Sequence, residues 1–428
     1  MTYQDIYIVD GIRTPFLKAA NKPNPFSAAD LSISACKNLL LQRSYPIEEV
    51  IAGCVIPSAD ETNIARIIGL RSGCKVSVPA MTVQRNCASG LQALDTAAQH
   101  IAELNYNLIL AGGTDAMSHA HLFFNEKMVL WFSQWFASKT LKQKLACLMQ
   151  LRPNFFVPII GLLRGLTDPV VKLSMGQTAE IIAHKFKITR QAMDEFALAS
   201  HKRAAMAQDK KLFEAEITSI YDTQGQAYEI DNGVRRDTTL EKLASLKPFF
   251  DKKFGNVTAG NSAQITDGAA FLILANENSV KKYNLPVLGR IVDTHWAALD
   301  PSEMGLGPAY AIPPLLKRNH LTANDIDYWE INEAFAAQVL ACLKVLKDAD
   351  YCKKHFNLDH AFGEIPMDRL NVDGGAIALG HPVGASGARL VLHLLHTLKR
   401  THTRYGVASL CIGGGQGGAM LVESINTG

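Results

Sequence analysis

The chain has 428 residues, of which 48% are hydrophobic and 19% are charged. This length allows two or three domains around a large core, and the composition is ordinary for a globular protein. The formal net charge of +3 is too small to predict nucleic-acid binding. The longest uncharged apolar runs, residues 128–138 and 153–163, are shorter than the roughly 18 residues that a membrane-spanning helix needs.

Eight cysteines are scattered along the chain, with no Cys-x-x-Cys pair and no histidine–cysteine cluster at metal-ligand spacing. This pattern predicts a reducing compartment and no metal site. Residues 1–10 read as the start of a strand with an acidic residue, and they lack the basic start and apolar run of a signal peptide. We therefore expect a cytoplasmic protein.

Short apolar or β-branched runs alternate with helical patterns in the first 120 residues. The predicted strands span residues 6–9, 49–56, 80–84 and 108–110, and the predicted helices span residues 28–41, 62–72 and 91–103. Such alternation is typical of layered α/β domains. Further along, the pattern over residues 176–208 is helical, with Met175 at its start and Thr189 placed to cap a helix.

The C-terminal third repeats the order of elements in the N-terminal part. Residues 288–293, 325–331, 384–387 and 409–415 echo residues 6–10, 47–53, 87–90 and 110–113. Four echoes in one order predict a duplicated α/β unit. We therefore expect an α/β fold of two repeated layered halves with a mostly helical insertion. The expected division is 1–118 with 255–287, then the insertion 119–254, then 288–428.

Two cysteines and a histidine stand in glycine-rich turns far apart in the sequence. Cys87 lies between a predicted strand and the predicted helix 91–103, so its sulfur should lie at the helix N-terminus with a lowered pKa. His381 stands in a glycine-rich loop before a helix. Cys411 follows a predicted strand at 406–410 and precedes three glycines, whose amides can face an oxyanion.

Asn332 also follows a predicted strand, in Glu-Ile-Asn-Glu-Ala-Phe. Taken singly, each of these residues also fits a purely structural role: a buried small thiol, a core histidine, a strand-end cysteine or a turn asparagine. Together they fall at strand ends or strand-to-helix loops in both halves. Open α/β sheets usually bind ligands there.

At this point the chain resembles the thiolase family over nearly its whole length. The motifs that carry the resemblance stand in the family's order at residues 9–15, 86–90, 112–118, 258–261, 267–270, 332–335, 380–382 and 411–415. They include Asn-Cys-Ala-Ser-Gly, Asn-Glu-Ala-Phe, Gly-His-Pro and Cys-Ile-Gly-Gly-Gly. The resemblance implies the thiolase fold and an acyltransferase.

The resemblance implies that Cys87 takes the acyl group, that His381 activates it, and that Cys411 protonates the departing acetyl-CoA enolate. It implies one oxyanion hole from His381 and a water held by Asn332, and a second from the amides of Cys87 and Gly413. The implied reaction cleaves 3-ketoacyl-CoA with CoA, in fatty-acid β-oxidation, to acetyl-CoA and a shortened acyl-CoA. Coenzyme A is then a substrate, and no cofactor is expected.

The resemblance also implies contacts with CoA and with the acyl chain. It places Arg235 at the adenine end of CoA. The alternative is that Arg235 is a solvated surface charge. It places Ser262 near the pantetheine, one position before the usual serine slot, which Ala263 occupies. The implied pocket lining, each member of which also fits ordinary core, is Met175, Phe250, Met304, Ala334 and Phe335.

Other functions stay open at this stage. One is a biosynthetic acetoacetyl-CoA thiolase, but such enzymes typically carry a histidine where this chain has Ser174. Another is a non-catalytic acyl-CoA-binding protein, which the set Cys87, His381 and Cys411 disfavours. Ketoacyl synthases pair their cysteine with two histidines and lack the Cys-x-Gly-Gly-Gly ending. The family also implies a homodimer or tetramer.

The segment 118–170 is basic and rich in aromatic residues, and it looks like the corresponding loop of trifunctional-enzyme β-subunits. We expect residues 127–150 and 153–163 to form an amphipathic hairpin. The expected aromatic side consists of Trp131, Phe132, Trp135 and Phe136, with lysines opposite. The segment 122–165 would then fit an anionic membrane surface or a hydratase/dehydrogenase α-subunit. Alternatively, it packs on its own subunit or covers the acyl tunnel.

Overall fold

The protein is described from a computed structural model that covers residues 6–20, 22–43, 45–104 and 106–425. The expected strand-like start at residues 1–5 lies outside these described residues. The N-terminal part of the chain and residues 266–283 form the first group of elements. These are β1 (Ile6–Arg13), β2 (Leu17–Lys18), α1 (Ala28–Gln42), β3 (Glu49–Gly53), α2 (Ile64–Arg71), β4 (Ala80–Val83), α3 (Ser89–Leu104), β5 (Leu108–Ala116), β10 (Thr266–Asn276) and α10 (Glu277–Tyr283).

The intervening residues and the C-terminal part supply the other elements. The intervening elements are β6 (Leu122–Phe123), α4 (Glu126–Ala137), α5 (Leu141–Met149), β7 (Ile159–Ile160), α6 (Gly161–Gly165), α7 (Met175–Lys185), α8 (Arg190–Asp209), β8 (Ile220–Tyr221), β9 (Ala227–Tyr228) and α9 (Leu240–Ala244). The C-terminal elements are β11 (Gly289–Ala298), α11 (Gly307–Arg318), β12 (Tyr328–Ile331), α12 (Ala336–Leu346), α13 (Ala349–Phe356), α14 (Ala376–Leu379), α15 (Val383–Thr401), β13 (Tyr405–Ile412) and β14 (Gln416–Glu423).

The strand order confirms the predicted duplication. One ten-stranded sheet runs β12-β13-β14-β11-β1-β10-β5-β3-β4, with β2 paired to β10 beside this path. The order β11-β14-β13-β12 therefore repeats β1-β10-β5-β3, and the halves join where β1 pairs with β11. Both joining strands change register within the same Ile-Val-Asp sequence, between Ile8 and Asp10 and between Ile291 and Asp293.

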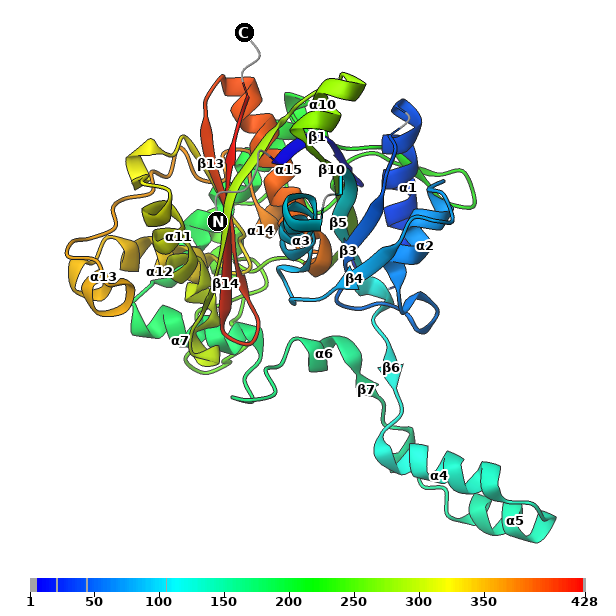
Figure 1. Cartoon of the computed structure of the whole chain (residues 1–428). Helices are drawn as coiled ribbons and strands as arrows, with labels where there is room; N and C mark the ends of the chain where they lie inside the picture. The colour runs from blue at the N-terminus through cyan, green and yellow to red at the C-terminus, as the bar shows by residue number, and fades with distance from the viewer. Residues whose placement is uncertain (1–5, 21, 44, 105, 426–428) are drawn as a thin grey trace.

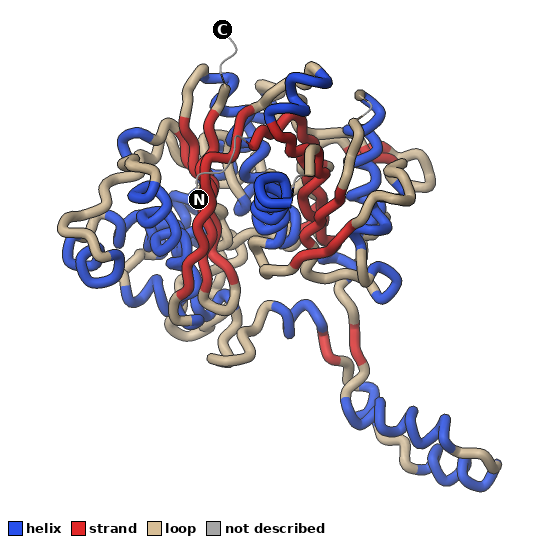
Figure 2. The backbone as a smooth tube through the Cα atoms, viewed as in Figure 1, coloured by secondary structure: helices blue, strands red, loops and turns tan. Residues whose placement is uncertain are grey.

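The two equivalent helices α3 and α15 lie together at the centre of the molecule, with strands on both sides of them (Figure 1). Further helices cover the outer faces of the strands (Figure 2), α1 and α2 on one half and α11 on the other, where α12 packs outside α11. Adjacent residues of a strand face different cores: Leu410 of β13 belongs to the central cluster, and Cys411 belongs to the outer one. This alternation places Cys411 between β13 and the helices of the outer layer.

Tertiary contacts explain where the predicted boundaries differ from the structure. The predicted strand 49–56 ends at Gly53. The reason is that the backbone N–H groups of Val55 and Ile56 donate to the side chain of Asp115 instead of to a neighbouring strand. The helical stretch predicted at 176–208 is two helices, α7 and α8. As expected, Met175 begins α7, and Thr189 caps α8 by accepting from the backbone N–H of Ala192 at 3.2 Å.

Helices α4 and α5 form an arm that extends away from the body of the molecule (Figure 1). The expected partner segment, residues 153–163, is not a helix of this hairpin: it divides among a short 3₁₀ turn, β7 and part of α6. The expected aromatic side chains do lie together, since Trp131 stacks on Trp135 and Phe132 stacks on Phe136. The expectation of lysines opposite them is wrong for Lys144, which lies over the Trp135 ring. Trp131 is buried within the arm and donates through Nε1 to the carbonyl of Cys147 at 2.9 Å. Phe136, in contrast, is 79% exposed.

Across the described residues, the helices are too short or too polar for any one of them to cross a bilayer.

Candidate active site

Cys87 lies in a tightly wound turn between β4 and α3. Ser89 Oγ accepts from the backbone N–H of Arg85 at 2.9 Å and donates to the carbonyl of Asn86 at 2.7 Å. Burial raises the pKa of the Cys87 thiol, and hydrogen bonds from the backbone N–H groups of Gly413 and of Cys87 itself oppose that rise. The expected lowering of this pKa by the helix N-terminus is therefore wrong, because desolvation outweighs it.

Cys411 lies inside β13, which continues to Ile412 instead of ending at residue 410 as expected. Its side chain is buried, and the pKa of its thiol is raised well above the usual range, first by burial and then by the nearby Cys87 thiol. The chain leaves β13 through a glycine turn with positive φ angles at Gly414 (92°) and Gly415 (75°). This turn meets the Cys87 turn of the other half, since Asn86 Nδ2 donates to the carbonyl of Gly413 at 2.8 Å.

His381 is held by hydrogen bonds on both ring nitrogens. Nε2 lies 3.3 Å from Asn332 Nδ2, and Nδ1 lies 2.6 Å from Ser386 Oγ. Because the Ser386 hydroxyl donates to the carbonyl of Pro382, it accepts from Nδ1–H, and Nε2 is left as the basic nitrogen. Burial, and then the Arg389 guanidinium, lower the pKa of His381 to about 4. The imidazole is therefore neutral at pH 7.

Asn332 directly follows β12, as predicted, and is completely buried. Its Nδ2 faces His381, while its Oδ1 has no hydrogen-bond partner among the described residues. An unpaired buried amide oxygen is costly unless it binds a ligand or a water. The Asn332 side chain is thus suited to hold a polar group beside His381.

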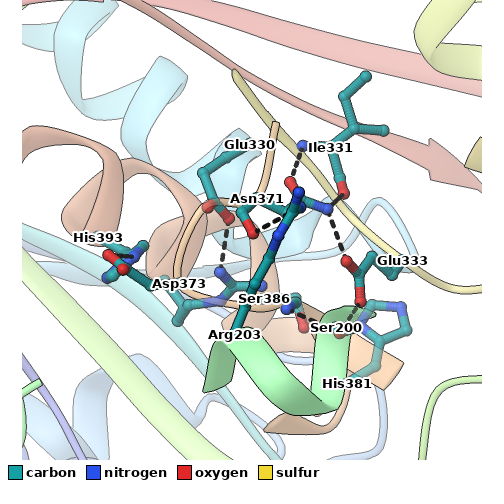
Figure 3. Close-up of polar contacts among 12 residues, drawn as sticks. Ser200, Arg203, Glu330, Ile331, Glu333, Asn371, Asp373, His381, Ser386 and His393 are labelled. Atoms are coloured by element: carbon teal, nitrogen blue, oxygen red, sulfur yellow. Dashed lines mark hydrogen bonds and ion pairs between the residues drawn. The ribbon is translucent and has the colours of Figure 1, made fainter. Parts of the chain in front are cut away.

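A buried carboxylate next to Asn332 fixes the loop that leads to His381 (Figure 3). Glu333 accepts from Ser200 Oγ at 2.6 Å, from Asn371 Nδ2 at 2.9 Å and from the backbone N–H of Ile377 at 3.2 Å. Burial raises the pKa of Glu333, and these three donors oppose the rise. The interaction joins β12, α8 and the start of α14.

The predicted lining residues all belong to the outer core cluster or pack against it. Met175 lies beside the glycine turn, because a Cβ on Gly413 would be 3.2 Å from its Sδ, and the rings of Phe250 and Phe335 meet edge to face at 5.9 Å. Met304 is only 3% exposed. Ala334 is also buried, and its carbonyl accepts from the backbone N–H of Ala263.

The two residues expected to contact CoA differ in accessibility. The Ser262 hydroxyl is buried and donates to the carbonyl of Thr258 at 2.7 Å, so its proton is already used. Arg235 lines a surface cavity of about 250 Å³ together with His201, Lys202 and Arg236. Burial, and then the charges of Arg235 and Lys18, lower the pKa of His201 to about 4. Lys202, Arg235 and Arg236 give the cavity three cations, and Asp209 also lines it and pairs with Arg236 at 2.8 Å. The net charge of the lining is positive, as an anion site requires.

Gln264 connects that basic cavity to His381. Its carbonyl accepts from the backbone N–H of His381 at 3.2 Å, and its Nε2 donates to the carbonyls of Gly233 and Ile377. Sequence reasoning missed Gln264, Glu333 and Ser386 as supporting residues. Glu333 and Ser386 stood inside motifs that had been recognised, so their positions were a usable signal, whereas Gln264 had none.

The geometry allows a defined chemistry. A neutral imidazole can take a proton from the Cys87 thiol, and the resulting thiolate can attack a carbonyl carbon. The backbone N–H groups of Cys87 and Gly413 lower the pKa of the Cys87 thiol against burial, so they can stabilise negative charge at this place. The Cys411 thiol stays protonated at neutral pH because its pKa is raised, so it can act as an acid.

Comparison with known proteins identifies relatives over the full length. The sequence matches the family models "Thiolase, N-terminal domain" at residues 6–278 and "Thiolase, C-terminal domain" at residues 285–424. Mitochondrial 3-ketoacyl-CoA thiolase of Homo sapiens is 38% identical over 426 residues, covering 98% of each chain. 3-Ketoacyl-CoA thiolase of Photobacterium profundum is 35% identical over 424 residues, covering 98% of this chain and 97% of the relative.

Solved structures agree with the sequence matches. The crystal structure of human mitochondrial 3-ketoacyl-CoA thiolase in complex with CoA superposes with a TM-score of 0.84 at 37% identity, covering 99% of this chain and 98% of that one. The Bacillus anthracis acetyl-CoA acetyltransferase superposes with a TM-score of 0.84 at 33% identity, covering 99% and 100%. Fold, motifs and relatives agree, and the chain belongs to the thiolase family of acyltransferases.

Proposed function

We propose that this chain is a 3-ketoacyl-CoA thiolase that shortens acyl chains by two carbons in fatty-acid β-oxidation. The observation that carries the proposal is the approach of three distant segments. Asn86, next to Cys87, bonds the Gly413 turn that follows Cys411, and a Cβ on Gly90 would lie 2.6 Å from the carbonyl oxygen of Gly384 in the segment after His381. Two named relatives with at least 35% identity over the full length act on 3-ketoacyl-CoA by their names. Their similarity supports the same substrate class here.

In the proposed first half-reaction, His381 Nε2 takes the Cys87 proton and the thiolate attacks C3 of the 3-ketoacyl-CoA. The C2–C3 bond then breaks, leaving an acyl group on Cys87. The electron pair goes to the enolate of acetyl-CoA, which Cys411 protonates at C2. A second acid is required because the leaving group is a carbanion equivalent. Two thiols in one site meet that requirement.

In the second half-reaction, free CoA attacks the acyl-Cys87 thioester. The CoA thiol loses its proton to the Cys411 thiolate, and Cys87 leaves as a thiolate that regains a proton from His381. The product is an acyl-CoA two carbons shorter, and all three side chains return to their starting states. The amides of Cys87 and Gly413 stabilise the oxyanion that forms on the acyl carbon.

The basic cavity supports CoA binding at the place where Arg235 was expected. CoA carries phosphates at its adenine end, and arginine side chains bind phosphate through paired hydrogen bonds. Lys202, Arg235 and Arg236 line this cavity. We therefore assign Arg235 to the CoA site and leave Ser262 out of it, because its hydroxyl is committed to Thr258.

The alternative function is acetoacetyl-CoA synthesis. Ser174, where acetoacetyl-specific relatives typically have histidine, caps α7 by accepting from the backbone N–H of Gln177. Thiolysis of 3-ketoacyl-CoAs from about four to sixteen carbons tests the proposal. Turnover that rises with chain length supports a degradative thiolase, turnover of the four-carbon substrate alone selects the alternative, and binding without turnover identifies a non-catalytic protein.

We also propose that the protein is a cytoplasmic homodimer or tetramer. β4 ends the ten-stranded sheet as far as the described residues show, and each of its four residues is half-buried. An edge strand of this kind commonly pairs with another chain. Its position next to the Cys87 turn would make assembly protect the site. Light scattering during size exclusion gives the oligomer mass, and a monomer would reject this part of the proposal.

The α4–α5 arm supports membrane contact. Its exposed apolar residues are Val129, Leu130, Phe136, Leu141, Leu145, Leu148 and Met149, and its basic residues include Lys127, Lys139, Lys142 and Lys144. A helix pair with apolar and cationic residues fits an anionic lipid surface. Co-sedimentation with liposomes containing about 30% anionic lipid should require residues 122–165. Capture of a hydratase/dehydrogenase α-subunit without lipid binding would assign the arm to that partner instead.

A further inference from the structure

We propose that Asn86 is a positioning residue for this reaction: its side-chain amide holds the glycine turn 413–415 against the Cys87 turn. Asn86 Nδ2 donates to the carbonyl oxygen of Gly413 at 2.8 Å, although the two residues stand 327 positions apart. The proposal rests on the proposed function, in which Cys87 is the nucleophile. It adds a residue that immediately precedes Cys87 in the chain.

The turn that Asn86 holds has no side chains of its own. Glycine samples more backbone conformations than any other residue, so three consecutive glycines depend on outside contacts for their shape. The C-terminal end of the glycine turn is fixed by the backbone N–H of Leu299, which donates to the carbonyl of Gly415 at 2.8 Å. Asn86 fixes the other end of the turn, next to Cys87.

Gly413 links the Asn86 side chain to Cys87. Its carbonyl accepts from Asn86 Nδ2 at 2.8 Å, and its backbone N–H opposes the rise that burial causes in the pKa of the Cys87 thiol. The Asn86 bond fixes the peptide plane that follows Gly413, and β13, which ends at Ile412, fixes the chain that precedes it. Gly413 is thus held on both sides, and with it the N–H that we assign to an oxyanion hole. Such donors act only when they are held in place before the charge develops.

Asparagine suits this position for two reasons. The backbone at residue 86 has a left-handed φ of 44°, a region that asparagine tolerates better than most residues other than glycine. Its amide also supplies a donor for a carbonyl, which aspartate lacks. The preceding residue makes a second link, because Arg85 Nη1 donates to Gln416 Oε1 at 3.2 Å.

The test compares Asn86→Asp and Asn86→Gly with wild type. Asparagine to glycine keeps the left-handed backbone and removes the amide without adding charge. Gln84→Ala is the matched control, because Gln84 lies in the same loop but donates to the carbonyl of Val55, outside the glycine turn. The readouts are kcat and KM for thiolysis, the thermal midpoint Tm, and the pH midpoint for alkylation of Cys87 by iodoacetamide.

Both Asn86 variants should lower kcat by about 10- to 100-fold, less than outright loss of an oxyanion donor. KM should stay within about threefold, since the change acts on the transition state. The alkylation midpoint should move to higher pH, because the Gly413 N–H no longer stabilises the thiolate. The Gln84→Ala control should match wild type in all these readouts.

Two results would overturn the proposal. One is Asn86→Gly with kcat within twofold of wild type and an unchanged alkylation midpoint. The other is a loss of kcat that accompanies a lower Tm while the alkylation midpoint stays fixed, which indicates a merely structural role. A wild-type protein that turns over no 3-ketoacyl-CoA would count against the proposed function instead. The alkylation midpoint would then still decide the role of Asn86.

Discussion

Single residues in this site are held mainly by uncharged hydrogen-bond partners. Asn332, Ser386 and Gln264 all contact His381, and none of them carries a charge. The closest charges, such as the Arg389–Glu330 pair at 2.8 Å, lie behind this layer and are fully buried. The neutral state of His381 is thereby set by burial and by Arg389 together.

Glu333→Gln should lower kcat by roughly 10-fold. The new amide nitrogen is a donor, and it would face one of the hydrogen-bond donors of Ser200, Asn371 or Ile377. A buried donor that faces another donor destabilises the structure by about 1–3 kcal/mol. The loop leading to His381 would then shift. Steady-state thiolysis measures the effect. Ser200→Ala, which removes one of the three donors, should lower kcat less than Glu333→Gln does. Equal losses of kcat in the two variants would contradict the role assigned to Glu333.

His393 should make stability depend on pH. Burial opposes its charge, but Glu216 and Asp373, at 2.9 and 3.2 Å, outweigh burial and raise the pKa of His393 to about 10. A histidine whose pKa is raised in the folded state stabilises the folded protein fully at pH values below its unfolded-state pKa of 6.5. It loses that contribution as the pH rises toward 10.

Urea unfolding between pH 6 and 10 measures this contribution. The free energy of unfolding of wild type should fall over that window, and the gap between wild type and His393→Gln should narrow as the pH rises. At pH 6 the variant should lose about 1–3 kcal/mol, because it removes a charged partner from two buried carboxylates, although Glu216 keeps Arg13 and Asp373 keeps Arg400. A gap that stays constant from pH 6 to 10 would show that His393 is not charged in the folded protein.

Residues within short motifs could be predicted from sequence, and their partners could not. Cys87, His381, Cys411 and Asn332 each stood in a recognisable local pattern. Ser200, in contrast, is 133 positions from Glu333 and lies in a helix without any distinguishing motif. The sign of the Cys87 pKa shift was also not predictable, because it depends on burial by residues from the other half.

Among the secondary-structure elements, the arm behaves as a separate unit. The buried residues Met128, Trp131 and Cys147 form a small cluster of their own, apart from the main cores. Trp131 stacks on Trp135 at 5.5 Å, and Lys144 lies over the Trp135 ring. Lys144 is thus on the aromatic side of the arm instead of facing away from it.

Trp131→Ala should unfold the arm without unfolding the body, because it removes the largest side chain of that small cluster. Hydrogen exchange should rise to solvent-like rates within residues 126–149 and stay unchanged in α3 and α15. Thiolysis should stay within twofold of wild type. If exchange in α3 rose as well, the arm would be part of the main cooperative unit.

The presence of individual helices could be predicted from the sequence, but the way in which helices and strands pack together could not. Capping residues such as Thr189 are local signals, and they placed α8 correctly. The end of β3 and the shape of the residues 153–163 depend on contacts with distant segments. Periodicity cannot report such contacts.

For the whole molecule, the central feature is the crossing of α3 and α15. A Cβ on Gly90 would lie 2.6 Å from the carbonyl oxygen of Gly384 and 3.0 Å from the backbone nitrogen of Ala388. The two halves therefore approach each other through backbone atoms at this point. The approach also brings the Cys87 turn close to the loop of His381.

Gly90→Ala should lower the free energy of unfolding by about 1–3 kcal/mol or more, because the added methyl must push the two central helices apart. Denaturant unfolding measures it. Gly165→Ala is the control, since a Cβ on Gly165 meets nothing within 4 Å. Equal stability of the two variants would contradict the close crossing.

The duplicated architecture could be inferred at this scale because the Ile-Val-Asp strands and the Ala-Ser-Gly helix starts recur in order. The joining of both halves into one sheet could not, because it depends on the pairing of β1 with β11. The proposed division of the chain into halves and insertion stays a prediction.

The most direct measurement of the central claim is peptide mapping by mass spectrometry after the protein is mixed with a 3-ketoacyl-CoA in the absence of free CoA. An acyl adduct should form on the peptide that contains Cys87. It should be absent from Cys87→Ala, and Cys411→Ala should still accept an acetyl group from acetyl-CoA without condensing it further. An adduct on another residue, or a stable adduct in Cys87→Ala, would contradict this account.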